Sequence, residues 1–154
     1  MEISDLLTQE SVLSNLKVTS KKQALQELSK RVAEGPDLSQ REVFDVLLER
    51  EKLGSTGVGN GVAIPHGKVK KITSLQGYFA KLERPIDFDS VDERPVDLVF
   101  LLLAPETSGV DHLKALALVS RLMKDKTVCH KLRGSDGVEA LYALLTNQET
   151  NQAA

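Results

Sequence analysis

The chain has 154 residues, of which 41% are hydrophobic and 27% are charged, as is usual for one folded globular domain. A net charge of −2, the absence of tryptophan and an aromatic content of only 4% argue against nucleic-acid binding, which needs a basic surface or a base-stacking platform. A single cysteine, Cys129, excludes an internal disulfide, and we expect a cytoplasmic protein because neither a signal peptide nor a membrane-spanning segment is visible.

Two helices are predicted before residue 54. The first follows a capping box at residues 20–23 and ends at the Gly-Pro pair 35–36, and the second follows a capping box at 39–42 and runs to about Lys52. Arg50 lies on the apolar stripe of the second helix, in its last turn. There it either stabilises the helix C-terminus or faces an anion near the next loop, since its planar guanidinium suits phosphate.

Beyond a Gly-rich stretch, strands are predicted at residues 61–65, 75–82 and 96–103, and helices at about 108–124, 125–133 and from 136 onward. The strand at 96–103 is an almost continuous apolar run, which is typical of a central strand buried on both faces. This order predicts an α/β fold in three layers, with one sheet between helices. We expect residues 1–147 to form a single domain and the polar tail, residues 148–154, to fray.

The stretch from Gly54 to Lys68 carries the strongest chemical signal. It reads Gly-Ser-Thr-Gly-Val-Gly-Asn-Gly-Val-Ala-Ile-Pro-His-Gly-Lys, and it fits neither a P-loop nor a dinucleotide-binding fingerprint, because the required lysine position and the strand-to-helix order are both missing. Imidazole is a good nucleophile near neutral pH, so His66 is a candidate for attack on phosphorus if a backbone carbonyl holds its second ring nitrogen. On the residues alone, a loop histidine among turn-forming glycines is an equally good interpretation.

The remaining residues of this stretch suggest a phosphate-binding loop. Glycines let the backbone approach a ligand closely, and the two hydroxyls can donate hydrogen bonds to phosphoryl oxygens. We therefore expect phosphate to be bound by Ser55, Thr56, Gly57, Gly59 and Asn60.

A second histidine, His112, falls in the first turn of the predicted helix that follows the central strand. Unpaired backbone N–H groups at a helix start favour an anion there, although a histidine at the edge of the core is the alternative. His130 lies in a charged stretch and is predicted to be on the surface. The three histidines and Cys129 lack metal-ligand spacing, so we expect neither a metal nor a cofactor.

These motifs carry a resemblance to a known family. Residues 54–68, with Glu49-Arg50-Glu51 before them, resemble the active-site segment of enzyme IIA domains of the mannitol/fructose class, from the bacterial phosphoenolpyruvate-dependent phosphotransferase system. The amino-acid sequence of this motif is most similar to that of the nitrogen-regulatory members, IIA-Ntr. A second block at residues 85–98 and the Leu-rich helix after His112 resemble the same family, whose fold is a mixed β-sheet flanked by helices on both faces.

The resemblance implies a phosphotransferase with a phosphohistidine intermediate. His66 would accept the phosphoryl group through Nε2 from an HPr-like phosphohistidine donor (NPr), with Arg50 and His112 flanking the site. The phosphorylation state would regulate target proteins such as sensor kinases or ion-transport proteins. Two alternatives stay open: a sugar-transport IIA component that passes phosphate to a separate IIB protein, since no fused IIB is visible, and a static anion-binding module.

Overall fold

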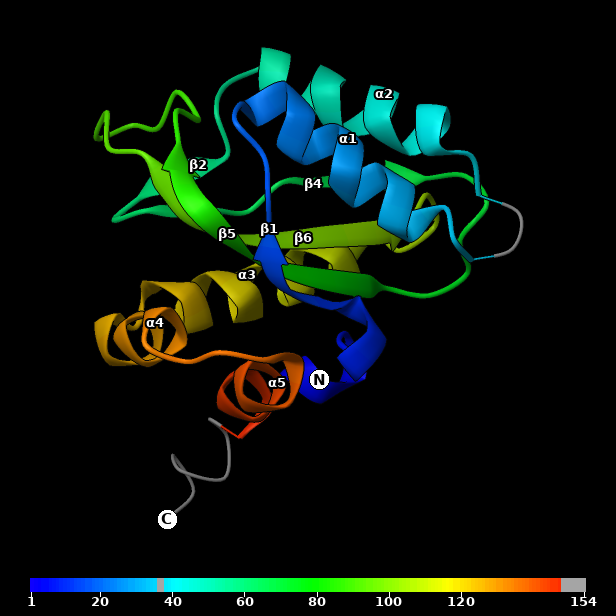
Figure 1. Ribbon diagram of the computed structural model, residues 1–154. Coiled ribbons are helices and arrows are strands. Elements are labelled where there is room, and N and C mark those ends of the chain that lie inside the picture. Colours follow the sequence, from blue (N-terminus) through cyan, green and yellow to red (C-terminus); the bar gives the residue numbers. More distant parts are fainter. Residues whose placement is uncertain (36–37, 148–154) are drawn as a thin grey trace.

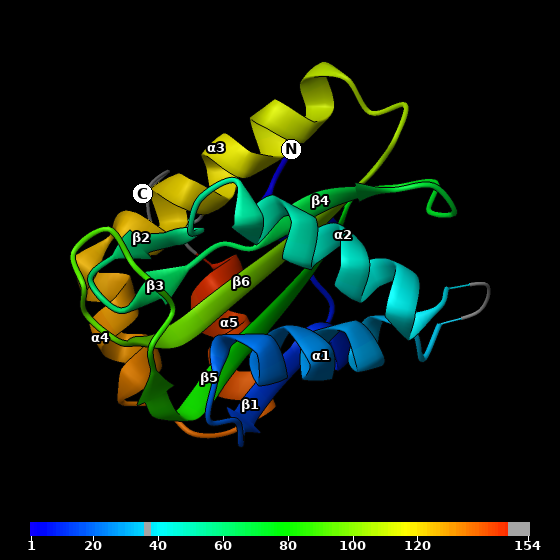
Figure 2. The ribbon, with the colours of Figure 1, turned by 90° about the horizontal axis from the view of Figure 1, so that it is seen from above.

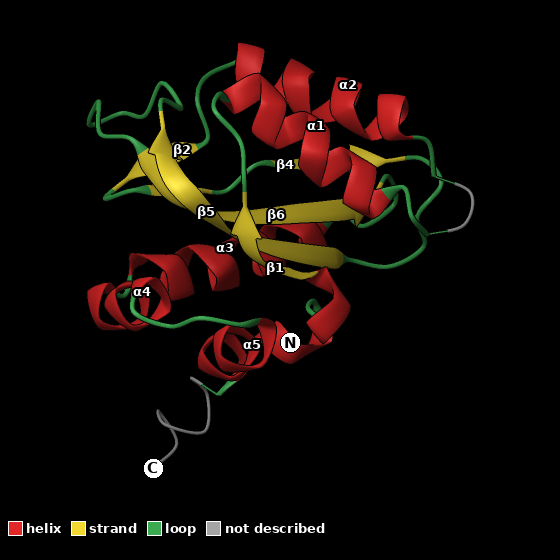
Figure 3. Ribbon diagram, viewed as in Figure 1, coloured by secondary structure: helices red, strands yellow, loops and turns green. Residues whose placement is uncertain are grey.

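The computed structural model describes residues 1–35 and 38–147, so the predicted polar tail, residues 148–154, lies outside the described residues. Over this range the chain forms six strands and five α-helices around one sheet (Figure 1, Figure 3). The strands are β1 (Val12–Leu16), β2 (Gly57–Gly59), β3 (Val62–Ala63), β4 (His66–Val69), β5 (Gln76–Ile86) and β6 (Val96–Pro105). The α-helices are α1 (Lys21–Val32), α2 (Gln40–Lys52), α3 (Val110–Lys124), α4 (Lys126–Arg133) and α5 (Val138–Thr146), and two short 3-10 helices, η1 (Ile3–Asp5) and η2 (Gln9–Ser11), precede β1.

The sheet is mixed and is centred on β6. Its strands follow the order β1-β5-β6-β3-β2, and β4 also pairs with β6. β6 runs antiparallel to β5 and parallel to β3 and β4, while β1 is parallel to β5. Every residue of β6 except Asp97 is buried, which confirms the predicted central strand.

Helices cover both faces of this sheet, as the order of elements predicts. Helices α1 and α2 lie over one face, and α3, α4 and α5 lie over the other (Figure 1, Figure 2). The pleat of β6 divides its side chains between two cores: Phe100 and Leu102 pack on the α3–α5 side, whereas Val99 and Leu101 pack on the α1–α2 side. The three-layer α/β fold is therefore confirmed.

Local capping explains where α1 and α2 begin. The Ser20 hydroxyl accepts a hydrogen bond from the Gln23 amide at 3.1 Å, and the Ser39 hydroxyl accepts one from the Glu42 amide at 3.3 Å. The return bond of the first capping box goes one residue further back than predicted, because the Gln23 side chain accepts from the Thr19 amide at 2.7 Å. The apolar stripes of both helices pack on the same face of the sheet.

The predicted strand at residues 61–65 is confirmed only in part, because the structure shortens it to Val62–Ala63. β3 ends at Ala63, the chain departs from strand geometry at Ile64 and Pro65, and β4 begins at His66. Proline has no N–H to donate to a strand ladder, although its carbonyl still accepts from the Leu102 amide at 2.9 Å. His66 therefore stands at the start of a strand and not at the end of one.

Candidate functional site

The break between β3 and β4 orients the His66 ring. Its Nδ1 lies 2.8 Å from the carbonyl oxygen of Ile64. A carbonyl can only accept, so Nδ1 carries the proton and Nε2 keeps its lone pair. The Ile64 amide in turn donates to the Thr56 carbonyl at 2.9 Å, which ties the break to the Gly-rich loop. The ring is half-buried, with the arrangement at Nδ1 that a histidine nucleophile requires.

Arg50 reaches this ring from the last turn of α2, which packs against β4 (Figure 2). Its Nε donates to Nε2 of His66 at 3.3 Å, and its Nη1 donates to the carbonyl of Gly54 at 2.8 Å. Of the two interpretations of Arg50 from the sequence, the structure favours the one that faces the Gly-rich loop. The guanidinium is held by the loop backbone and points at the candidate nucleophile.

The protonation of His66 follows from these neighbours. Burial lowers the pKa of the imidazole below its ordinary 6.5, and the positive charge of Arg50 acts in the same direction. The hydrogen bond to Ile64 and the negative charge of Glu51 raise the pKa in opposition, without reversing the shift. The neutral ring, which is the nucleophilic form, is therefore favoured.

His112 comes to the same place from the first turn of α3. Its ring centroid lies 5.9 Å from that of His66, with the two planes tilted by 42°. Its Nδ1 is buried and finds no hydrogen-bond partner among the described residues. Burial, the neighbouring His66 and the charge of Lys68 all lower the pKa of His112. An unpartnered buried ring nitrogen is costly, and a hydrogen-bond partner gained by a small movement of the ring would remove this cost.

Glu51 is a functional candidate that the sequence reasoning missed. Its carboxylate is buried and accepts hydrogen bonds from both the amide of Thr56, at 3.0 Å, and the Thr56 hydroxyl. Lys21, at the start of α1, places its ammonium 2.9 Å from the same carboxylate. The helical spacing of 43, 47 and 51 was the available signal, because it puts Glu51 on the buried stripe of α2.

The two hydroxyls of the Gly-rich loop both donate hydrogen bonds to residues outside the loop. Ser55 donates to the carbonyl of Phe88 at 2.6 Å and accepts from the Gly57 amide at 3.0 Å, while the Thr56 hydroxyl is held by Glu51. Gly57 packs closely on Ser90, since a Cβ there would lie 2.3 Å from that residue's hydroxyl oxygen. Phosphate binding by Ser55, Thr56 and Gly57 stays a prediction, and the contacts seen here give them a shaping role.

The structure does not bring Gly59 and Asn60 to His66. Gly59 ends β2 and Asn60 begins the turn to β3, with φ of +104° and +57°. Gly59 thus meets the turn's need for a left-handed backbone, and Asn60 tolerates one. The start of β3 pairs with Leu98 whereas His66 pairs with Leu102, which separates the turn from the ring by roughly 13 Å at ~3.3 Å per residue.

An apolar rim surrounds the two histidines. Leu53 follows the α2 turn that carries Arg50, and Val110 and Leu113 flank His112 on α3. These three side chains are 85%, 64% and 64% exposed. Exposed large apolar groups around a reactive side chain indicate a surface that docks another protein.

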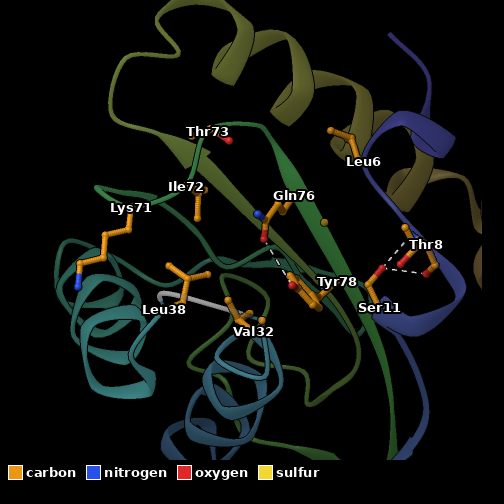
Figure 4. A pocket seen from close by; sticks show the side chains of 12 residues that line it. Leu6, Thr8, Ser11, Val32, Leu38, Lys71, Ile72, Thr73, Gln76 and Tyr78 are labelled. Atoms are coloured by element: carbon orange, nitrogen blue, oxygen red, sulfur yellow. Dashed lines mark hydrogen bonds between the residues drawn. The ribbon is translucent and has the colours of Figure 1, made fainter.

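A cavity of about 400 Å³ lies beside β5, and Figure 4 shows Gln76 and Tyr78 on one wall with Thr8 and Ser11 on another. His66 is not among its lining residues. Across residues 1–35 and 38–147, no group of three or more His, Cys, Asp or Glu side chains is placed to hold a metal ion, and no helix is long and apolar enough to cross a membrane.

The sequence of the chain is similar to that of known proteins along nearly its whole length. The family described as "Phosphoenolpyruvate-dependent sugar phosphotransferase system, EIIA 2" matches residues 5–148. A "Nitrogen regulatory protein" of Bradyrhizobium diazoefficiens is 58% identical over 145 residues, covering 94% of this chain and 95% of that protein. One from Escherichia coli (strain K12) is 43% identical over 150 residues, covering 97% and 92%.

Solved structures show the same likeness. The crystal structure of "Nitrogen Regulatory Protein IIA-Ntr" from Neisseria meningitidis superposes with a TM-score of 0.88 at 35% identity, covering 94% of this chain and 99% of that one. IIA mannitol from Escherichia coli superposes with a TM-score of 0.76 at 22% identity, covering 91% and 99%, and this shows a shared fold.

Proposed function

The chain belongs to the EIIA 2 family of the phosphoenolpyruvate-dependent phosphotransferase system, in its nitrogen-regulatory group, and from that premise we propose the role of each site residue. His66 accepts a phosphoryl group on Nε2 from the phosphohistidine of an HPr-like donor, NPr. The phosphorylated and free forms then regulate target proteins differently. The proposed place of action is the cytoplasm.

One observation carries the proposal: the hydrogen bond from Nδ1 of His66 to the carbonyl of Ile64, at 2.8 Å. It fixes the ring and its tautomer, so that Nε2 presents a lone pair outward. Burial keeps the pKa of the ring low and the ring neutral. No general base is needed, because the attacking nitrogen carries no proton.

The transfer step needs one proton from solvent besides the two proteins, and it leaves the phosphorylated His66 ring as an imidazolium because Nδ1 keeps its proton. The lone pair of Nε2 forms a new P–N bond as the P–N bond in the donor's phosphohistidine breaks. The donor imidazole leaves with the bonding electron pair and becomes neutral by taking up a proton from its surroundings. The proton on Nδ1 of His66 stays in its hydrogen bond to Ile64 throughout.

Arg50 and His112 act on the phosphoryl group in flight, whose negative charge spreads over three oxygens. The guanidinium of Arg50, which donates to Nε2 in the free form, turns its donors to those oxygens. His112 offers the ring nitrogen that has no partner among the described residues. Both groups therefore stabilise charge that is greatest during transfer.

Regulation follows from charge placed within an apolar rim. Phosphohistidine resembles phosphoserine in carrying roughly −1.5 to −2 charges at neutral pH. The whole chain has a net charge of only −2, so phosphorylation about doubles it at one point. A target that docks on the rim formed by Leu53, Val110 and Leu113 would meet a desolvated anion, which can cost several kcal/mol. We expect at least one target, such as a sensor kinase or an ion-transport protein, to prefer the free form.

A mass measurement tests the proposal. The protein is incubated with phosphoenolpyruvate and the general phosphotransferase proteins of its cell, and the intact mass is recorded. The protein should gain the mass of one phosphate. This phosphate should be released in acid and retained in alkali. His66→Gln should gain none, whereas His130→Gln, at an exposed histidine on α4, should gain it as the unchanged protein does. A phosphorylated His66→Gln protein would exclude His66 as the acceptor, and transfer onward to a IIB cysteine would favour the sugar-transport alternative.

A further inference from the structure

A second cavity, of about 360 Å³, lies where the end of α3, the helix α4, the β2–β3 turn and the loop before β6 converge (Figure 1). Its lining carries four cationic side chains and one histidine but no carboxylate: Arg94, Lys124, Lys126, Arg133 and His130. These are four of the 20 Lys and Arg residues of a chain whose net charge is −2. Cations concentrated around one concave volume create a local field that attracts anions.

Three of these four cations form no ion pair within residues 1–35 and 38–147. In the described part of the chain, neither Arg94 nor Lys124 nor Lys126 takes part in an ion pair. Arg133 is paired with Asp97 at 2.9 Å, whereas the other three cations of the lining make no ion pair among the described residues, although Arg94 lies close enough to Asp92 for its charge to help lower the pKa of that carboxyl. Uncompensated like charges gathered at one place are unfavourable unless an anion joins them.

The nearby carboxylates are used for other purposes. Asp92 accepts from the amides of Asn60, at 2.9 Å, and Arg94, at 3.1 Å. Asp125 caps α4 by accepting from the amides of residues 127 and 128. Neither of these carboxylates is part of the cavity lining.

Arg133 gives the cavity one fixed wall. Its guanidinium donates to both oxygens of Asp97 and, through Nη2, to the carbonyl of Asn60 at 2.8 Å. On α4, Lys126 lies two turns before Arg133, and His130 lies between them on the same face. The cavity thus combines one rigid cation with flexible lysines that can close on a ligand.

We propose that this basic cavity is a binding site for a small anion with two or more negative charges, such as a phosphorylated or polycarboxylate metabolite. Its volume falls in the range of about 300–1,000 Å³ that is usual for small-molecule sites. Its walls come from four separate segments that face one volume, which suits a compact ligand. The site is separate from His66, since His112 and Lys124 stand at opposite ends of α3, roughly 18 Å apart at ~1.5 Å per residue.

Amide chemical shifts of the full chain, recorded during titration with inorganic pyrophosphate, test the site. Sodium chloride at equal ionic strength is the blank, and citrate forms a second arm that separates phosphate from carboxylate recognition. We expect saturable shifts at Asn60 and along residues 124–133. Lys126→Gln and Arg94→Gln should each weaken binding by about tenfold, as is usual for loss of a charged hydrogen-bond donor.

Lys131→Gln is the matched control, because it removes the same charge from an exposed position of α4 that does not line the cavity. It should leave the affinity unchanged. Equal weakening by Lys131→Gln, shifts that only follow ionic strength, or shifts centred on His66 would each overturn the proposal. So would binding of polyglutamate without binding of either small anion, since that result would assign the surface to an acidic protein segment.

Discussion

Replacing Arg50 separates a role in phosphoryl transfer from a role in folding. The guanidinium makes two hydrogen bonds from different nitrogens, to Nε2 of His66 at 3.3 Å and to the carbonyl of Gly54 at 2.8 Å. Arg50→Gln removes the charge, and Arg50→Lys keeps the charge but has only one donor group for two acceptors that a planar fork satisfies together. Both variants keep most of the aliphatic stem that packs on the helix.

The two roles predict different magnitudes. Loss of one preorganised donor to a developing anion slows transfer by about 10²–10³-fold, or ≈ 2.7–4 kcal/mol. The folded state of Arg50→Gln loses about one net hydrogen bond, roughly 0.5–1.5 kcal/mol. For a domain of this length, that lowers the melting temperature by about 1–6 °C. In free-energy terms, Arg50→Gln should therefore lower the transfer rate by more than it lowers the stability of the fold. The transfer rate of Arg50→Lys should lie between those of Arg50→Gln and the unchanged protein.

The assay is single-turnover transfer from the phosphorylated donor, quenched in alkali and followed by intact mass, alongside calorimetry of each variant. Lys52→Gln is the control, because it removes an exposed cation from the same helix turn. It should transfer at the unchanged rate. If Arg50→Gln also transfers at that rate, or if its loss of activity disappears wherever the variant is fully folded, the guanidinium has a structural role and the proposed step is wrong.

Three further predictions concern the same site. His112→Ala should slow single-turnover transfer while its melting temperature, measured by calorimetry, stays within a few degrees. Because burial lowers the pKa of His66, the transfer rate should stay flat through neutral pH and fall only as pH drops below that lowered pKa. The folded state then binds fewer protons than the unfolded state below pH 6.5, so the free energy of unfolding should fall as pH drops through that window, and His66→Gln should remove this part of the slope. Glu51→Gln should cost about 1–3 kcal/mol in denaturant titrations, since the partly buried Lys21 then keeps only its 3.7 Å contact to the exposed Asp89, whereas the exposed Glu49→Gln should cost less than about 1 kcal/mol.

Features with a local cause could be predicted from the sequence. The starts of α1 and α2 are set by Ser20 and Ser39, whose hydroxyls cap the next turn. The central place of β6 follows from its apolar run, interrupted only by Asp97, which only a strand covered on both faces can bury. His66 and His112 could be singled out because one follows a Gly-rich stretch and the other opens a helix.

Features that depend on pairing between distant segments could not be predicted in this way. β1 carries no clear alternation, and it becomes a strand because β5 offers a parallel edge to Val12 and Leu13. The glycine pattern of the loop predicted phosphate contacts for Gly59 and Asn60, yet the pairing of β2 with β3 makes them a turn. The role of Glu51 was hidden for the same reason, since its partner Lys21 belongs to another helix.

The interruption at Pro65 links the fold to the chemistry of His66. Pro65 has no N–H to donate, although its carbonyl still accepts from the Leu102 amide, and beside it the Ile64 carbonyl accepts the proton on Nδ1 of His66. The chain then rejoins β6 as β4, so the ring is anchored on both sides by a buried sheet. The break between β3 and β4, which the sequence pattern did not predict, is thus the feature that fixes the tautomer of the proposed nucleophile.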